Sequence, residues 1–239
     1  MSLSATAVQS GAAVHIALAS TAGRLYTFTL AANGALEPSA AWDAHTLEGW
    51  AVAFDPCDAN VLYSGGDDAA LLRWDLRSGT VAGANRKSHR AGVCCIAPGG
   101  ELRQHQIATG SYDEYIRLWD CRKLNQPLCE HQAGGGAWRL RWHTTEPHLL
   151  LAACMHDGFK VVRLADGALE EAVAYRKHGV PDSLGYGVDW MDSDAATGGF
   201  RRHTVVSCSF YDRAVHTWEF HDDGVCSPTL AEFADAGRP

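Results

Sequence analysis

The 239-residue chain has no long apolar run, no Cys-x-x-Cys pair and no Gly-x-Ser-x-Gly sequence. No stretch reaches the ~18 apolar residues that a membrane-spanning helix needs, so we expect no membrane segment. Without Cys-x-x-Cys spacing, the eight cysteines do not match a typical structural zinc site, and we interpret them as reduced, mostly buried thiols. The missing Gly-x-Ser-x-Gly turn argues against an α/β-hydrolase nucleophile.

Basic residues are few as well. Lys and Arg total 20 against 28 Asp and Glu, and the net charge is -8. A surface that binds a nucleic-acid duplex needs a basic patch, so we expect no nucleic-acid partner. The segment 1–11 lacks the basic and apolar regions of a secretory signal, which together with reduced cysteines predicts a cytoplasmic protein. Frequent Gly (24) and Trp (8) with only 3 Met favour short strands and tight turns.

Four segments of the chain are similar to one another. Each has an Asp in a short polar turn, and the recurrent Asp residues lie 45, 44 and 55 positions apart: Asp68, Asp113, Asp157 and Asp212. Six positions later come Trp74, Trp119, Arg163 and Trp218. A histidine precedes each segment: His45, His89, His131 and His178. We attribute the longest interval to an exposed, polar and Gly-rich loop over 191–202.

This arrangement resembles the WD-repeat family, in which each period of about 40–45 residues builds one four-stranded blade of a β-propeller. We therefore expect an all-β propeller with about five blades, near 1–43, 44–86, 87–130, 131–176 and 177–235. Within the weak first blade we expect strands at 13–20 and 24–30. Propellers of this family more often have about seven blades, so the ring is either small or incomplete, and the weak first unit favours a chain that lacks N-terminal blades.

The same resemblance implies a hydrogen-bonded tetrad of His, Ser, Asp and Trp in each blade, with the Ser two positions before the Asp. Only the third unit has all four residues: His89, Ser111, Asp113 and Trp119. The second unit has Gly66 at the Ser position. We expect these tetrad residues to stabilise the fold. Because the histidines recur once per blade and lie far apart around the ring, we predict no metal site, and we predict no cofactor.

Five stretches go beyond the generic repeat. In chain order they are GSYDEYIRLWD (110–120), GGGAWRLRWH (134–143), AACMHDGF (152–159), YGVDW (186–190) and CSFYD (208–212). Together they resemble the diphthine methylesterase family of WD-repeat proteins, also called diphthine methyltransferase, over roughly residues 45–220. The resemblance implies hydrolysis of the methyl ester of methylated diphthine, a trimethylammonium-bearing residue of elongation factor 2, in diphthamide biosynthesis. The alternatives are a non-catalytic WD-repeat scaffold and an inactive, shortened relative.

Ester hydrolysis needs a base and donors for the oxyanion. Residues just before each recurrent Asp are expected on one axial face of a propeller, which makes His156 a candidate general base; a polar rim residue is the alternative. Gly134, Gly135 and Gly136 are candidate oxyanion amides, or simply a turn that needs glycine. Two possible nucleophiles are more readily assigned to the core: Cys154 and Ser209.

Substrate binding has its own candidates. Tyr112, Trp138 and Tyr211 can surround the trimethylammonium group through cation–π contacts. Arg139 can hold a carboxylate. Because aromatic side chains are common at the binding faces of ordinary propellers, the scaffold reading accounts for them too.

Overall fold

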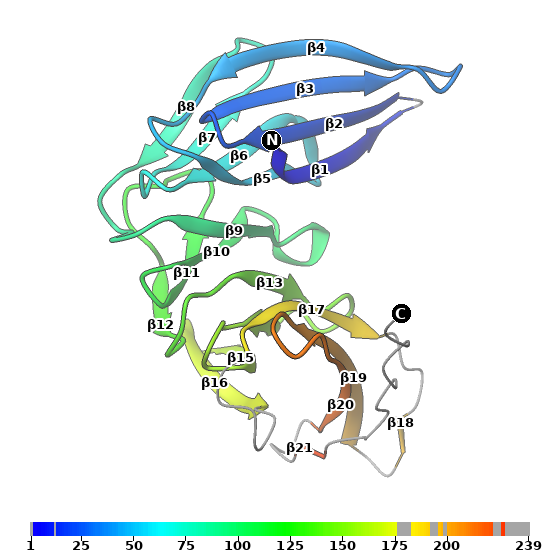
Figure 1. The fold of residues 1–239 in the computed structure, drawn as a ribbon, viewed down its shortest axis with the longest axis vertical. Coiled ribbons are helices and arrows are strands. Elements are labelled where there is room, and N and C mark those ends of the chain that lie inside the picture. The colour runs from blue at the N-terminus through cyan, green and yellow to red at the C-terminus, as the bar shows by residue number, and fades with distance from the viewer. Residues whose placement is uncertain are drawn as a thin grey trace.

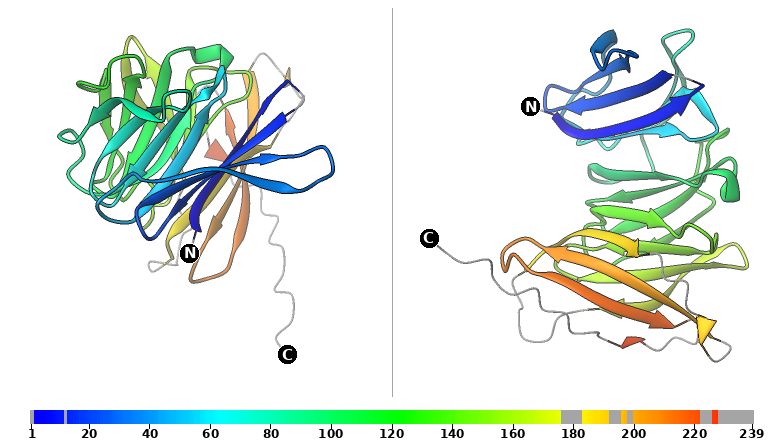
Figure 2. Two further views of the ribbon diagram at one scale, coloured as in Figure 1. Left: turned by 90° about the horizontal axis from the view of Figure 1, so that it is seen from above. Right: turned by 90° about the vertical axis from the view of Figure 1, so that its right-hand side faces the viewer.

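The computed structural model describes residues 2–11, 13–175, 183–191, 196–197, 200–221 and 226–227. These residues form five antiparallel sheets that follow one another along an arc (Figure 1). The turned views show the same order, with the first and fifth sheets at opposite ends (Figure 2). The expected all-β propeller architecture is confirmed. Among the described residues, no helix is long and apolar enough to cross a membrane.

Each of the first four sheets is a four-stranded meander. The first contains β1 (Ser2–Ser10), β2 (Ala13–Ser20), β3 (Arg24–Leu30) and β4 (Leu36–Asp43). The second contains β5 (Gly49–Asp55), β6 (Asp58–Gly66), β7 (Leu71–Asp75) and β8 (Thr80–Asn85). The third contains β9 (Val93–Pro98), β10 (Gln106–Ser111), β11 (Tyr115–Asp120) and β12 (Cys129–Gln132), with a 3-10 turn (Glu101–Arg103) after β9. The fourth contains β13 (Arg139–Trp142), β14 (Leu149–Ala153), β15 (Phe159–Ala165) and β16 (Ala168–Tyr175).

The fifth sheet has an additional short strand. It contains β17 (Gly185–Met191), β18 (Ala196–Thr197), β19 (Phe200–Ser209), β20 (Val215–His221) and β21 (Cys226–Ser227). The loop expected over 191–202 is therefore partly strand, because β19 begins at Phe200 and its start pairs with β18. Residues 192–195 and 198–199 of that loop lie outside the described residues.

The recurrent Asp residues lie in the turns between the second and third strands, as expected. The following Trp74, Trp119 and Trp218 lie on the third strands β7, β11 and β20 and are buried. The two strands expected in the first sheet match β2 and β3. Apolar side chains from neighbouring sheets pack together; Leu25 of β3, for example, belongs to one buried cluster with Trp74.

The innermost strands set the axis of the arc. β1 lies beside β5, β5 beside β9, β9 beside β13, and β13 beside β17. The first strand of each sheet therefore lines the axis of the arc. The turns at the same end of the five sheets lie on the same side of the molecule.

A buried polar network anchors the turn of the second sheet. His45 contacts Asp68 through Nδ1 at 2.9 Å and Ser64 through Nε2 at 2.9 Å, and Trp74 donates to Ser64 Oγ at 2.9 Å. The expectation that this unit lacks its serine was wrong, because the serine lies four positions before the Asp. Gly66 lies two positions before Asp68, where the serine was expected. A Cβ atom at Gly66 would lie 2.6 Å from His45 Nδ1, so no side chain fits there.

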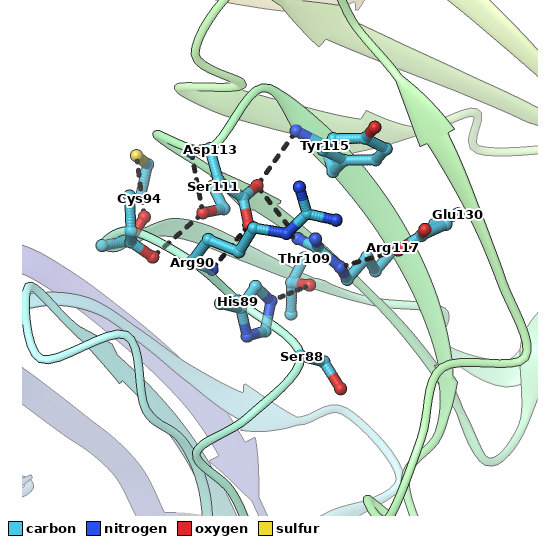
Figure 3. A network of polar contacts seen from close by, with 12 residues as sticks. Ser88, His89, Arg90, Cys94, Thr109, Ser111, Asp113, Tyr115, Arg117 and Glu130 are labelled. Carbon is cyan, nitrogen blue, oxygen red and sulfur yellow. Dashed lines mark hydrogen bonds and ion pairs between the residues drawn. The ribbon is translucent and has the colours of Figure 1, made fainter.

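The third sheet also differs from the expected tetrad (Figure 3). His89 Nε2 and Trp119 Nε1 both contact Thr109 Oγ1, each at 2.9 Å. Ser111 was wrongly assigned to this role: its hydroxyl donates to the Ala91 carbonyl at 3.1 Å and accepts from the amide of residue 113. The linking hydroxyl is thus again four positions before the Asp, within the second strand.

In the third sheet, Asp113 pairs with a buried cation. Arg117 Nη1 lies 2.9 Å from the Asp113 carboxylate, and Arg117 Nε lies 3.2 Å from Glu130 (Figure 3). Burial alone would raise the pKa of Asp113, but hydrogen bonds from Arg117 and the Arg90 amide outweigh it and hold that pKa below its ordinary value.

In the fourth sheet a lysine pairs with the recurrent Asp in the same way. Lys160 Nζ lies 2.9 Å from Asp157 and 2.5 Å from Glu171. Burial would lower the pKa of Lys160, yet the two carboxylates raise it. In these two sheets a cation on the third strand joins the turn to the fourth strand.

Candidate functional site

The turns before the recurrent Asp residues and the loops that lead into the first strands are joined at one face. Backbone amides in the turns donate to carbonyls in these loops in three sheets: Asp67 to Glu48 at 2.8 Å, Tyr112 to Gly92 at 2.9 Å, and Phe210 to Leu184 at 3.0 Å. We call this the turn face. In these three sheets the turn and the loop therefore lie together at the same end of the sheet.

Aromatic rings form a continuous row across the turn face, with Trp138 in the middle. Ring centroids lie 6.1 Å from Trp138 to Trp50, 6.4 Å from Trp138 to Tyr112 and 5.2 Å from Trp138 to Tyr186. The second, third, fourth and fifth sheets each contribute to this row. Two of the predicted binding residues, Tyr112 and Trp138, are thus neighbours in space.

The row continues over the fifth sheet. Tyr186 lies 5.6 Å from Phe210, and Phe210 lies 5.1 Å from Tyr211. Phe210 and Tyr211 are 64% and 65% exposed, which is unusual for large aromatic side chains. Tyr211, the third predicted aromatic residue, is therefore joined to the others through two rings that the sequence interpretation did not include.

A cavity of about 700 Å³ opens along the axis between the inner strands β1, β5, β9 and β13. Its wall includes Glu48, Trp50, Trp138 and Arg139. Arg139 is exposed and has no ion pair among the described residues, so its guanidinium is available to an anionic group. We call this space the axial cavity.

Cysteine thiols in and near the axial cavity are unsuited to nucleophilic attack. Cys95 lines it, and burial raises the pKa of Cys95 to about 12. Cys154 is buried nearby in the same cluster, and burial raises its pKa to about 12 as well. Because the thiolate is the nucleophile, these thiols are inert near neutral pH.

His156 lies on the turn between β14 and β15 and is exposed. Among the described residues it forms no hydrogen bond, ion pair or ring contact. The structure therefore does not bring it into contact with Tyr112, Trp138 or Tyr211. The preceding Met155 has φ 46 and its carbonyl accepts from the Gly185 amide at 2.8 Å, which fixes the backbone next to His156.

The three consecutive glycines pack against the same turn. A Cβ atom at Gly134 would lie 2.5 Å from Asp157, and one at Gly136 would lie 2.7 Å from Met155 Sδ. A Cβ at Gly135 would collide with the Cys154 carbonyl oxygen. Close packing thus accounts for the glycines, and only Gly134 is exposed.

Comparison with known proteins shows which proteins this chain resembles. The model of the WD domain, G-beta repeat, matches residues 84–120. The human protein named diphthine methyltransferase is 46% identical over 157 residues, which cover 65% of this chain and 34% of that protein. The Schizosaccharomyces pombe protein of the same name is 35% identical over 184 residues, which cover 74% of this chain and 53% of that protein. This chain is a WD-repeat propeller protein that is similar to the proteins named diphthine methyltransferase.

Two further facts define the extent of this similarity. The chain spans about a third to a half of the length of the family members that it matches. A solved structure, "Crystal Structure of Mitotic Checkpoint Complex", superposes with a TM-score of 0.67, covering 90% of this chain and 63% of that one, at 18% identity. At that identity the likeness shows a shared propeller fold alone.

One network in this protein has the connectivity of a hydrolase triad. Asp68, His45 and Ser64 are linked in series, as Asp, His and Ser are in serine hydrolases. Ser64 is 0% exposed and also accepts the Trp74 indole hydrogen bond, so no substrate carbonyl can reach it. Burial lowers the pKa of His45 despite the neighbouring carboxylate. The network is an anchor of the fold.

Ser209, the other hydroxyl considered as a nucleophile, holds the last turn. Its Oγ donates to the Asp212 carboxylate, which also accepts from Ser183 at 2.7 Å. Within the described residues, no group of three or more His, Cys, Asp or Glu is arranged to hold a metal ion. His178 lies outside the described residues.

Sequence reasoning missed Trp50, Tyr186 and Phe210. A signal for the first two exists: a small residue followed by an aromatic one recurs where the first strand starts, as Gly49–Trp50, Ala137–Trp138 and Gly185–Tyr186. The repeat signature is centred on the second and third strands, so a search for it passes over these positions.

Proposed function

We propose that this chain takes part in diphthamide biosynthesis, where it hydrolyses the methyl ester of methylated diphthine on elongation factor 2. The similarity to proteins named diphthine methyltransferase carries this proposal. In the reaction, water adds to the ester carbonyl carbon, the bond to the methoxy oxygen breaks, and diphthine and methanol are formed. The aromatic row on the turn face supports a substrate that is presented to this face.

The residues on the turn face have separate roles in this proposal. His156 takes the proton from the attacking water, because an exposed imidazole can act as a base near neutral pH. The backbone amides of Gly134, Gly135 and Gly136 stabilise the oxyanion, and of these three residues Gly134 is exposed. Tyr112, Trp138, Arg139 and Tyr211 bind the substrate.

The test is to incubate the purified chain with elongation factor 2 that carries the methyl ester. Loss of the mass of one methylene group from the intact factor is the expected result. His156→Ala should lower turnover by about 10²–10⁴ with the fold intact, whereas Tyr211→Ala should mainly weaken substrate binding. His148→Ala is a matched control, because His148 lies on the loop at the opposite end of β14.

A non-catalytic scaffold is the second candidate function. It is favoured by one observation: His156 has no partner among the described residues that would orient it as a base. Absence of methyl loss, or equally small effects of His156→Ala and Tyr211→Ala, would favour the scaffold over the hydrolase.

A further inference from the structure

Trp50 forms a cluster with Tyr112 and Trp138 beside the axial cavity, which Trp50 and Trp138 line. Its ring centroid lies 6.1 Å from each of the other two, which are 6.4 Å apart. The ring planes are inclined to one another by 48° to 78°, so none of the three pairs is stacked. The three rings come from three sheets and enclose a triangle at the turn face.

Two carboxylates lie beside Trp50. Trp50 Nε1 donates to Glu48 Oε2 at 3.1 Å. The second carboxylate, Asp67, approaches the Trp50 ring across Gly92, which has no side chain. A Cβ atom at Gly92 would lie 2.5 Å from the Trp50 ring and 3.1 Å from Asp67 Oδ1. Neither Glu48 nor Asp67 has an ion pair among the described residues. The aromatic cluster is therefore bordered by two carboxyl groups that form no ion pair with a described residue.

This combination is chemically selective. The faces of aromatic rings carry negative potential and attract cations, most strongly when the cation is weakly hydrated. A quaternary ammonium group has a diffuse charge and apolar methyl groups, and it needs no hydrogen-bond acceptor. A primary ammonium group, in contrast, needs acceptors placed at hydrogen-bond distance when it leaves water.

We propose that Trp50, Tyr112 and Trp138, with Glu48 and Asp67, form a binding site for a quaternary ammonium cation. Glu48, Trp50 and Trp138 line the axial cavity, so this site has open space beside it. Arg139 lines the same cavity, which favours a ligand whose trimethylammonium group lies a few bonds from a carboxyl group. The natural ligand rests on the proposed function, because methylated diphthine has this chemistry.

The experiment titrates the purified chain with choline and with 3,3-dimethyl-1-butanol, which has the same shape without the charge. Calorimetry and tryptophan fluorescence report binding. Choline should bind about tenfold more tightly than the neutral alcohol. Trp50→Leu should weaken choline binding by about tenfold, and Trp50→Phe should restore part of the loss.

A charge variant provides a second readout that does not depend on packing. Glu48→Gln should weaken choline binding several-fold and leave the neutral alcohol unaffected. Glu37→Gln is the matched control, since Glu37 is an exposed carboxylate on β4 of the first sheet. If Trp50→Leu fails to fold, Glu48→Gln decides the question, because Glu48 is exposed.

Several outcomes would overturn the inference: no choline binding, equal affinity for the neutral alcohol, or choline affinity unchanged by Glu48→Gln. Its failure is distinguishable from failure of the proposed function. Ester hydrolysis without choline binding would overturn the cation site and leave the hydrolase standing. Choline binding without ester hydrolysis would support the cation site and overturn the proposed hydrolase function.

Discussion

Replacing Asp113 by alanine tests whether the recurrent Asp is an anchor of the fold. Its carboxylate pairs with Arg117, whose side chain is 1% exposed, and accepts hydrogen bonds from the Arg90 and Tyr115 amides. Removing one partner of a buried ion pair typically costs about 3–5 kcal/mol. Glu130 remains 3.2 Å from Arg117, so we expect a loss at the lower end, about 3 kcal/mol.

The assay is urea unfolding followed by tryptophan fluorescence and circular dichroism. Asp120→Ala is the control, because Asp120 pairs with Arg122, whose side chain is 61% exposed; this variant should shift the midpoint much less. Adding Arg117→Met to Asp113→Ala should recover part of the loss, because no cation is then left buried. An Asp113→Ala protein that unfolds like the control, or that keeps its stability but loses the proposed ester hydrolysis, would refute this reasoning.

The other expected outcomes can be measured in the same way. Thr109→Val should lower the free energy of unfolding by about 1–2 kcal/mol and Thr109→Ser by less, because the serine keeps the hydroxyl shared by the two buried rings. Burial, helped by the Arg117 charge, lowers the pKa of His89 to about 4, while an unfolded histidine takes up its proton near 6.5. Stability from His89 is therefore complete above pH 6.5 and declines as the pH falls towards 4, and His89→Gln should flatten this dependence in urea midpoints. Gly135→Ala should lower the melting temperature, because the new Cβ atom would collide with the Cys154 carbonyl oxygen. Gly83→Ala is the control, because its Cβ atom would have its nearest neighbour at 3.8 Å and would not clash.

The periodic part of the fold was predictable from sequence. A turn with Asp six positions before a buried Trp recurs in the second, third and fifth sheets, so the spacing of Asp68, Asp113 and Asp212 predicts the second and third strands there. The hydroxyl of the anchor was not located, because Gly66 and Ser111 fall at equivalent positions and only one is a serine. In the structure both linking hydroxyls, Ser64 and Thr109, lie four positions before the Asp, inside the second strand, whether or not the position two before the Asp carries a side chain.

The candidate site was predictable only in part. Tyr112 and Trp138 were found because they lie in unusual stretches of sequence, and they do meet. Trp50 was missed because its neighbours in space come from other sheets, and distance along the chain does not report that proximity. His156 shows the opposite case: its sequence context is distinctive, yet no described residue contacts it.

The arc makes this molecule a linear series of coupled units. Each sheet packs against the next through its inner strand, and the first and fifth sheets lie at opposite ends (Figure 1). In such a series the free energy of folding is approximately a sum over units and nearest-neighbour interfaces. Among the described residues the first and fifth sheets each pack against one neighbouring sheet and the third packs against two, so we expect the first and fifth to open at lower free energy. Weakening the third sheet should also uncouple the sheets on either side of it, since the main contacts between the described sheets pass through it. The aromatic row spans that position, so the stability of the third sheet decides whether the rings from the second and fifth sheets stay in register.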